Sequence, residues 1–96
     1  MDADGFEWDD EKAEKNFRKH AVTFGEAATV FDDPLTATIP DEDHSDDEDR
    51  FLTVGMSAQG RVLIVSHTDR DGNIRIISAR AASAGERKGY ANGTFP

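Results

Sequence analysis

Basic and titratable side chains gather in one short stretch of a chain that is otherwise acidic. The sequence KNFRKH, residues 15–20, contains Lys15, Arg18, Lys19 and His20, although the 96-residue chain has a formal net charge of -9. Lysine and arginine bind anions, and histidine transfers protons near neutral pH. The same residues also suit the last turn of a helix, where positive charge complements the helix dipole. A functional and a purely structural explanation are both open from this stretch alone.

Further candidates for chemistry lie in the second half of the chain. His67 follows the apolar run VLIVS, and Arg75 and Arg80 belong to the segment IRIISAR. Because side chains alternate along a strand, Arg75 and Arg80 are expected on opposite faces unless a β-bulge intervenes. His67 is equally explained as a hydrogen-bonded histidine of the core or of a strand edge.

The patterns of apolar and helix-forming residues predict eight elements. In order, they are a strand at 5–9, helices at 9–20 and 22–31, strands at 35–40, 50–56, 61–68 and 73–80, and a helix at 83–90. Asp9 or Asp10 is the expected N-cap of the first helix. A Ser/Thr-x-x-Glu capping box is predicted at Thr23 and again at Ser83. This order favours an α+β fold, in which two helices pack on one face of a mostly antiparallel sheet.

Composition places further limits on the protein. The length suits one domain over residues 1–96, with a core at about 5–90 and a disordered tail at 91–96. The chain has no cysteine, no apolar run as long as a membrane span and an acidic N-terminus, so we expect a cytoplasmic protein without disulfides. The run DEDHSDDED at 41–49 reads as a solvated loop, and its spacing does not fit a calcium-binding EF-hand.

The charge is divided unevenly between the two halves of the chain. Residues 1–49 hold 17 Asp and Glu against 4 Lys and Arg, whereas residues 50–96 hold 3 against 7. An acidic excess repels nucleic acid at long range, so any binding of nucleic acid requires a local basic patch. Solubility or a salty cytoplasm would explain the acidic excess equally well.

Several separated motifs together resemble a known family. FEWDDEKAEKNFRKHAVTFGEAATVFDDP, HSDDEDRFLTVGMSAQGRVLIVSHT and IRIISARAA occur in that order between Phe6 and about Tyr90. This arrangement resembles the BrnT-type toxins of type II toxin-antitoxin systems. The resemblance implies a fold like that of the RelE and ParE toxins, and a ribonuclease activity that inhibits translation. It also implies a BrnA-type antitoxin partner in a two-plus-two assembly, which contacts operator DNA only through the antitoxin.

The resemblance also assigns roles to the candidate residues. Cleavage of RNA by its own 2'-hydroxyl requires proton transfer and stabilisation of charge on the phosphate, without a metal or a cofactor. The catalytic candidates are therefore His20, Lys19, Arg75, Arg80 and His67. The candidates for binding RNA or phosphate are Lys15, Arg50, Arg87, Lys88 and Tyr90. Tyr90 could stack on a base or attach the last helix to the sheet, and Arg50 could instead pair with Glu48 on the surface.

The terminal helix departs from the family pattern. Relatives carry more Arg and Lys after the IRIISAR block, whereas AASAGERKGY retains only Arg87 and Lys88. Fewer cations weaken phosphate binding, because each neutralised phosphate releases counterions. The alternative function is therefore a catalytically weak or silent toxin homologue that acts as a protein-binding module.

Overall fold

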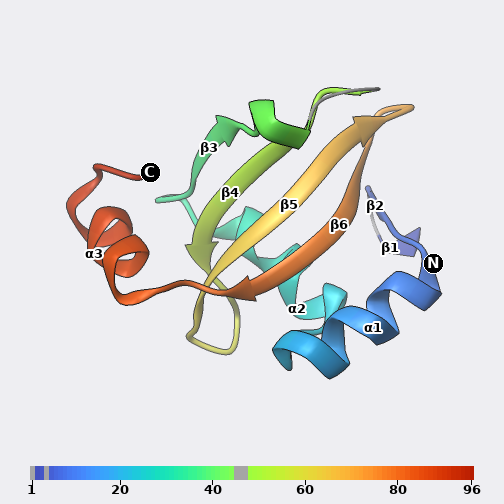
Figure 1. The fold of residues 1–96 in the computed structure, drawn as a ribbon, viewed down its shortest axis with the longest axis horizontal. Helices are drawn as coiled ribbons and strands as arrows, with labels where there is room; N and C mark the ends of the chain where they lie inside the picture. The colour runs from blue at the N-terminus through green and yellow to red at the C-terminus, as the bar shows by residue number, and fades with distance from the viewer. Residues whose placement is uncertain (1, 4, 45–47) are drawn as a thin grey trace.

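Six strands form one mixed sheet in the computed structural model, which describes residues 2–3, 5–44 and 48–96 (Figure 1). The strands are β1 (Asp2–Ala3), β2 (Phe6–Glu7), β3 (Ala37–Pro40), β4 (Phe51–Met56), β5 (Val62–Arg70) and β6 (Asn73–Ala81). The helices are α1 (Asp10–His20), α2 (Phe24–Thr29) and α3 (Ala84–Asn92), with 3-10 turns η1 (Val30–Asp32) and η2 (Glu42–His44). The predicted α+β class is confirmed.

The strands lie in the order β1-β2-β6-β5-β4-β3. β3, β4, β5 and β6 pair antiparallel in that order. Short turns join β4 to β5 and β5 to β6, as expected for antiparallel neighbours, whereas residues 41–50 join β3 to β4. β2 instead runs parallel to β6, with Phe6 opposite Ile74. A parallel neighbour is possible here because β2 and β6 are separated by a long connection, which contains α1, α2 and the strands β3 to β5.

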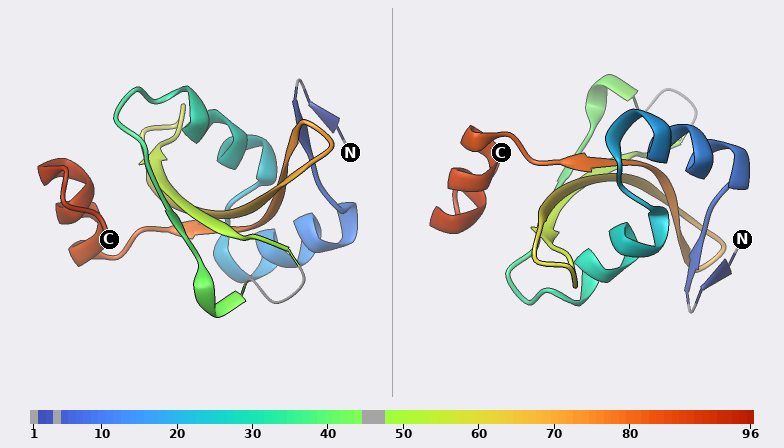
Figure 2. Two further views of the ribbon diagram at one scale, coloured as in Figure 1. Left: turned by 90° about the horizontal axis from the view of Figure 1, so that it is seen from above. Right: turned by 90° about the horizontal axis from the view of Figure 1, so that it is seen from below.

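The two N-terminal helices do not share one face of the sheet as predicted. Figure 2 shows α2 on the concave side of the curved sheet, whereas α1 runs alongside β6 at the sheet edge. Asp9 caps α1, since its carboxylate accepts a hydrogen bond from the Lys12 backbone N–H at 3.0 Å.

The capping box predicted for the second helix is only half formed. The Thr23 hydroxyl accepts a hydrogen bond from the Glu26 backbone N–H at 3.0 Å. The buried Glu26 carboxylate instead accepts hydrogen bonds from Arg61 and Ser57. Hydrogen bonds from Arg61 are the main reason that the pKa of Glu26 lies below its usual value. A long-range ion pair has therefore replaced a local cap.

Each face of the sheet carries its own apolar cluster. The larger cluster lies between α2 and the concave face and includes Phe24, Leu63 and Ile76. The smaller lies on the opposite face, where Tyr90 and Phe95 pack against residues of β4 and β5. The segment 91–96 was expected to be disordered, but it completes α3 and then places Phe95 in this second cluster. Apolar burial of the Phe95 ring explains the difference.

The acidic segment at 41–49 begins with η2, and its residues 45–47 lie outside the described part of the chain. The Glu48 carboxylate accepts hydrogen bonds from the Arg70 guanidinium at 3.2 and 3.3 Å, so its observed partner is Arg70. In the described segments 2–3, 5–44 and 48–96, no helix has the length and apolar character to cross a bilayer. Nor do three or more His, Cys, Asp or Glu side chains in these segments gather as a possible metal site.

Candidate active site

A β-bulge in β6 brings Arg75 and Arg80 to the same face of the sheet. Ser66 pairs with Ser78 while the next residue, His67, pairs with Ile76, so that Ile77 is an extra residue in β6. Arg80 lies opposite Ile64, and Arg75 lies opposite Thr68. Residues 64 and 68 share one face of β5 because they are four apart. A β-bulge, which the sequence alone could neither predict nor exclude, therefore lies between Arg75 and Arg80.

Asn16 attaches α1 to the edge of β6 beyond the point where β2 ends. Its side-chain amide donates to the carbonyl oxygens of Val22 and Ala79 at 3.0 and 2.9 Å, and its oxygen accepts from the Ala79 N–H at 3.1 Å. Because residues 16 and 20 lie one turn apart on the helix, His20 faces β6 beside Asn16. The last turn of α1 is thus fixed next to the open face of the sheet.

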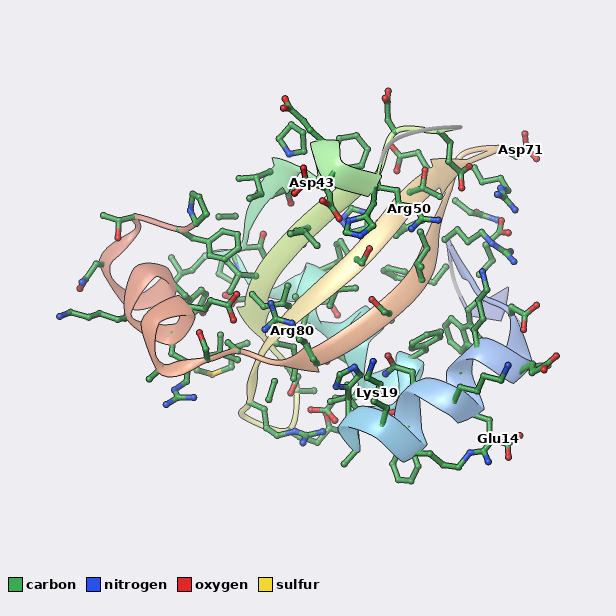
Figure 3. The ribbon with its side chains drawn as sticks, viewed as in Figure 1. Glu14, Lys19, Asp43, Arg50, Asp71 and Arg80 are labelled. Carbon is green, nitrogen blue, oxygen red and sulfur yellow. The ribbon has the colours of Figure 1, made fainter. Side chains whose placement is uncertain are left out.

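Two adjoining hollows occupy this corner. The larger has a volume of about 300 Å³ and is lined by His20, Leu52, Ile64, Ser66, Ser78, Ala79 and Arg80. The smaller, of about 220 Å³, is lined by Lys12, Lys15, Asn16, Lys19, His20, Ile77 and Ser78. His20 and Ser78 line both, so the two hollows form one feature, which we call the cleft. In Figure 3, Lys19 and Arg80 lie near its two parts, whereas Arg50 lies at the opposite end of the sheet.

Arg80 enters the cleft as half of an ion pair. Its Nη1 and Nη2 atoms donate to the two carboxylate oxygens of Glu86 at 2.7 and 2.9 Å. Glu86 also accepts a hydrogen bond from the backbone N–H of Ser83, which completes the predicted capping box of α3. The hydrogen bonds from Arg80 lower the pKa of Glu86 to about 2. The carboxylate therefore remains charged at neutral pH and offsets the charge of Arg80.

Arg75 shares the face of the cleft but does not line it. Its Nη1 donates to the Glu7 carboxylate at 2.7 Å, across the parallel β2–β6 pair. This hydrogen bond is the main cause of the lowered pKa of Glu7. The observed contact of Arg75 is thus with the neighbouring strand β2.

His67 lies on the opposite face from the cleft. Its ring is buried between Phe31 and Phe51, with centroid distances of 5.0 and 5.8 Å. The His67 Nε2 atom hydrogen-bonds the Thr53 hydroxyl at 2.7 Å, while Nδ1 has no partner among the described residues. Burial lowers the pKa of His67. The structure therefore does not bring this imidazole together with that of His20.

The remaining predicted binding residues are dispersed. Lys15 lines the smaller hollow, and its ammonium lies 3.4 Å from the Glu11 carboxylate. Arg50 lines a separate hollow with Phe51, away from the cleft. On α3, the Tyr90 hydroxyl donates to Asp33 and so connects this helix to the segment after η1.

The other two basic candidates of α3 also lie outside the residues that line the cleft. The Arg87 guanidinium donates to the Ala82 carbonyl at 3.0 Å, next to the start of the helix. Lys88 is exposed on α3. Of the basic residues predicted to bind RNA, only Lys15 therefore lines part of the cleft.

Three residues of this corner were missed as site residues from the sequence. Ser66 and Ser78 line the larger hollow, and Asn16 attaches the helix that carries His20 to β6. Asn16 did carry a signal, because it is a short polar residue among long charged ones and lies on the helix face of Ala13 and His20. The two serines carried none, since small polar residues in a strand are common on any exposed face.

Fold and cleft together define a small α+β protein that holds an imidazole and several cations at one open site. The model of a family described as "Ribonuclease toxin, BrnT, of type II toxin-antitoxin system" matches residues 8–86. The chain therefore belongs to the BrnT family of ribonuclease toxins. Its fold is similar to the 1.1 Å crystal structure of the Brucella abortus ribonuclease toxin BrnT. The identity is 22% and the TM-score 0.61, over 79% of this chain and 92% of that one. No protein of curated function matches the chain.

Proposed function

We propose that the protein is a metal-independent endoribonuclease and that the cleft is where it cleaves RNA. The observation that carries this proposal is that His20 and Ser78 line both hollows, so that Lys19, His20 and Arg80 share one site. An imidazole beside two kinds of cation provides both proton transfer and charge stabilisation. Membership of a family of ribonuclease toxins supports the same assignment.

The reaction divides among three side chains. The His20 imidazole removes the proton from a ribose 2'-hydroxyl, whose oxygen then forms a bond to the adjacent phosphorus. Arg80 and Lys19 stabilise the negative charge that develops on the phosphate oxygens. The bond from phosphorus to the 5'-oxygen breaks, and Lys19 protonates that oxygen. The products are a 2',3'-cyclic phosphate and a free 5'-hydroxyl, so atoms and charges balance without a metal ion.

The family context extends the proposal to partners. Cleavage of RNA in the cytoplasm would inhibit translation, and a BrnA-type antitoxin would neutralise the toxin in a two-plus-two assembly. Operator DNA would be contacted only through that antitoxin. We also infer kinship with the RelE and ParE toxins, which the α+β sheet with its N-terminal helices is consistent with.

Expression without an antitoxin tests the proposed activity. The parent should arrest growth, and the purified protein should cleave single-stranded RNA equally well with and without EDTA. His20→Ala and Arg80→Ala should each abolish cleavage, whereas Arg18→Ala, whose side chain pairs with Glu14 at 3.5 Å, should not. Intact RNA with folded parent protein would refute the assignment, and loss of cleavage in EDTA would refute metal independence.

A second function is favoured by a specific observation, namely that cations near the cleft face carboxylates. Arg80 pairs with Glu86, Arg75 with Glu7, and Lys15 with Glu11. Such pairing weakens phosphate binding and supports a silent toxin homologue that only binds an antitoxin. Growth of the parent at a normal rate, together with tight complex formation with the antitoxin, would decide for this alternative.

A further inference from the structure

Two serines, Ser66 and Ser78, line the larger hollow. Ser66 of β5 and Ser78 of β6 lie directly opposite each other in the antiparallel register. Side chains so paired are close enough to act on one group, because their Cβ atoms lie about 4.5–5.5 Å apart. Neither hydroxyl hydrogen-bonds another residue in the described part of the chain, although both residues are half-buried. The two serines therefore offer donors and acceptors that the fold itself leaves unused.

The rest of the lining is divided by polarity. Leu52 and Ile64 supply its larger apolar side chains, and both also belong to the second apolar cluster. His20 and Arg80 supply the charged or titratable groups at the same hollow. Among the described residues, no Phe, Tyr or Trp ring lines either hollow, and the proposed reaction already uses the His20 ring and the Arg80 guanidinium, which could otherwise stack on a base. A lining of apolar side chains and free hydroxyls instead suits a sugar, which has C–H faces and hydroxyl edges.

We propose that the larger hollow is a ribose subsite, in which Ser66 and Ser78 hydrogen-bond the sugar and select RNA over DNA. This inference rests on the proposed function, because it takes the substrate to be single-stranded RNA. The 2'-hydroxyl is the group by which a protein distinguishes RNA from DNA. A serine hydroxyl suits it, since both groups can donate and accept.

This placement agrees with the chemistry assigned to the cleft. A ribose against Leu52 and Ile64 would present its 2'-hydroxyl to His20, which lines the same hollow. The adjoining phosphate would then lie between Arg80 and Lys19. The two serines act as binding and positioning residues in this arrangement, and they take no proton in the reaction.

Binding measurements can test the subsite separately from catalysis. Single-stranded RNA and DNA of one sequence are titrated into proteins that carry His20→Gln, so that RNA remains intact. We expect Ser66→Ala and Ser78→Ala each to weaken RNA binding about 3- to 10-fold, the effect of one lost hydrogen bond. DNA binding should stay unchanged, so the preference for RNA should fall by the same factor. Thr94→Ala, which removes an exposed hydroxyl outside the cleft, serves as the control.

The possible results separate the subsite from the activity. If Ser66→Ala and Ser78→Ala keep the parental melting temperature but weaken the binding of RNA and DNA equally, the serines contact the phosphate. That result would overturn the ribose assignment. Unchanged RNA binding in both variants would overturn it as well. If the unmodified protein, which retains His20, does not cleave RNA, the nuclease assignment is refuted. A preference for RNA that depends on Ser66 and Ser78 would still support the ribose subsite in that case.

Discussion

The guanidinium of Arg80 and the carboxylate of Glu86 form a bidentate ion pair, with N–O distances of 2.7 and 2.9 Å. Arg80 lines the cleft, whereas Glu86 belongs to the first turn of α3 and caps that helix. A carboxylate engages arginine in the same paired geometry as a phosphate. Glu86 thus occupies donors that an RNA phosphate would use.

Removal of the Glu86 charge should strengthen RNA binding. Glu86→Gln retains an oxygen for the capping box but loses the ionic partner of Arg80. We expect tighter binding of single-stranded RNA and a salt dependence, as the slope of log K against log salt, that is steeper by about 0.7. Fluorescence anisotropy over a series of salt concentrations measures both. Glu14→Gln is the control, because it changes the net charge by the same amount. Glu14 pairs with Arg18, away from the cleft. The same gain in both variants would count against a specific role of Glu86.

The same pair should give the protein an acid-dependent component of stability. The pKa of Glu86 is lowered to about 2 from its usual value of 4.5, chiefly by the hydrogen bonds from Arg80. A carboxyl group whose pKa is lowered by folding stabilises the fold fully at pH values above its pKa in the unfolded chain. This stabilisation is lost as pH falls through the pKa of the group in the folded protein. The difference in unfolding free energy between the parent and Glu86→Gln should therefore shrink from pH 4.5 to about 2. Urea denaturation at several pH values tests this, and a difference independent of pH would contradict it.

Asn16 should be required both for stability and for cleavage. It makes three buried hydrogen bonds that join α1 to Val22 and to the edge of β6. Asn16→Ala would leave buried backbone groups of Ala79 unpaired, which we expect to lower the unfolding free energy by about 2 to 4 kcal/mol. Chemical denaturation measures the loss. Folded Asn16→Ala should also cleave RNA more slowly than the parent, since His20 is no longer fixed beside Ser78. A parental cleavage rate would show that α1 is positioned by other contacts.

The single tyrosine reports on the attachment of α3. The Tyr90 hydroxyl donates to Asp33, and this contact raises the Tyr90 pKa to about 12 from its usual value of 10.0. A raised pKa means that the stabilisation is complete below pH 10 and lost as pH rises through about 12. Ultraviolet titration of the folded protein should show tyrosinate forming near pH 12. Asp33→Asn should bring the midpoint back toward 10, and a parental midpoint in that variant would refute the assignment.

His67 should affect stability and its pH dependence but not cleavage. Burial lowers its pKa below the usual value of 6.5, so the imidazole binds a proton more readily in the unfolded chain than in the folded protein. Stability should therefore fall as pH drops below 6.5, and His67→Gln should lose this dependence. Thermal unfolding at pH 5 to 8 tests this expectation. Cleavage by folded His67→Gln should match the parent, in contrast to His20→Gln, and abolished cleavage would place His67 in the mechanism.

Local interactions could be predicted from the sequence because they depend on residues near one another in the chain. Asp9 is the N-cap of α1, and Ser83 and Glu86 form the capping box of α3. A tight turn before Asn73 joins β5 to β6. The α+β class and the family followed from the same short motifs. These features need only the backbone preferences and hydrogen bonds of a few consecutive residues.

Contacts between distant segments could not be read from the same patterns. Glu26 was predicted to cap its own helix, but Arg61, from the end of the β4–β5 hairpin, is its partner. His67 and His20 were considered together, yet they lie on opposite faces of the sheet. In both cases the outcome depended on which side chain the folded sheet brought near, a property that sequence spacing does not contain.

The sequence by itself determined the helix starts, the strands at the centre of the sheet and the family to which the chain belongs. Only the tertiary structure decided that Arg75 and Arg80 share a face, that Asn16 fixes His20 beside Ser78, and that Glu86 offsets Arg80. The physical reason is that one extra residue in a strand reverses the side-chain alternation beyond it. Whether such a bulge forms is decided by packing against the neighbouring strand, and so the cleft exists only once the sheet has assembled.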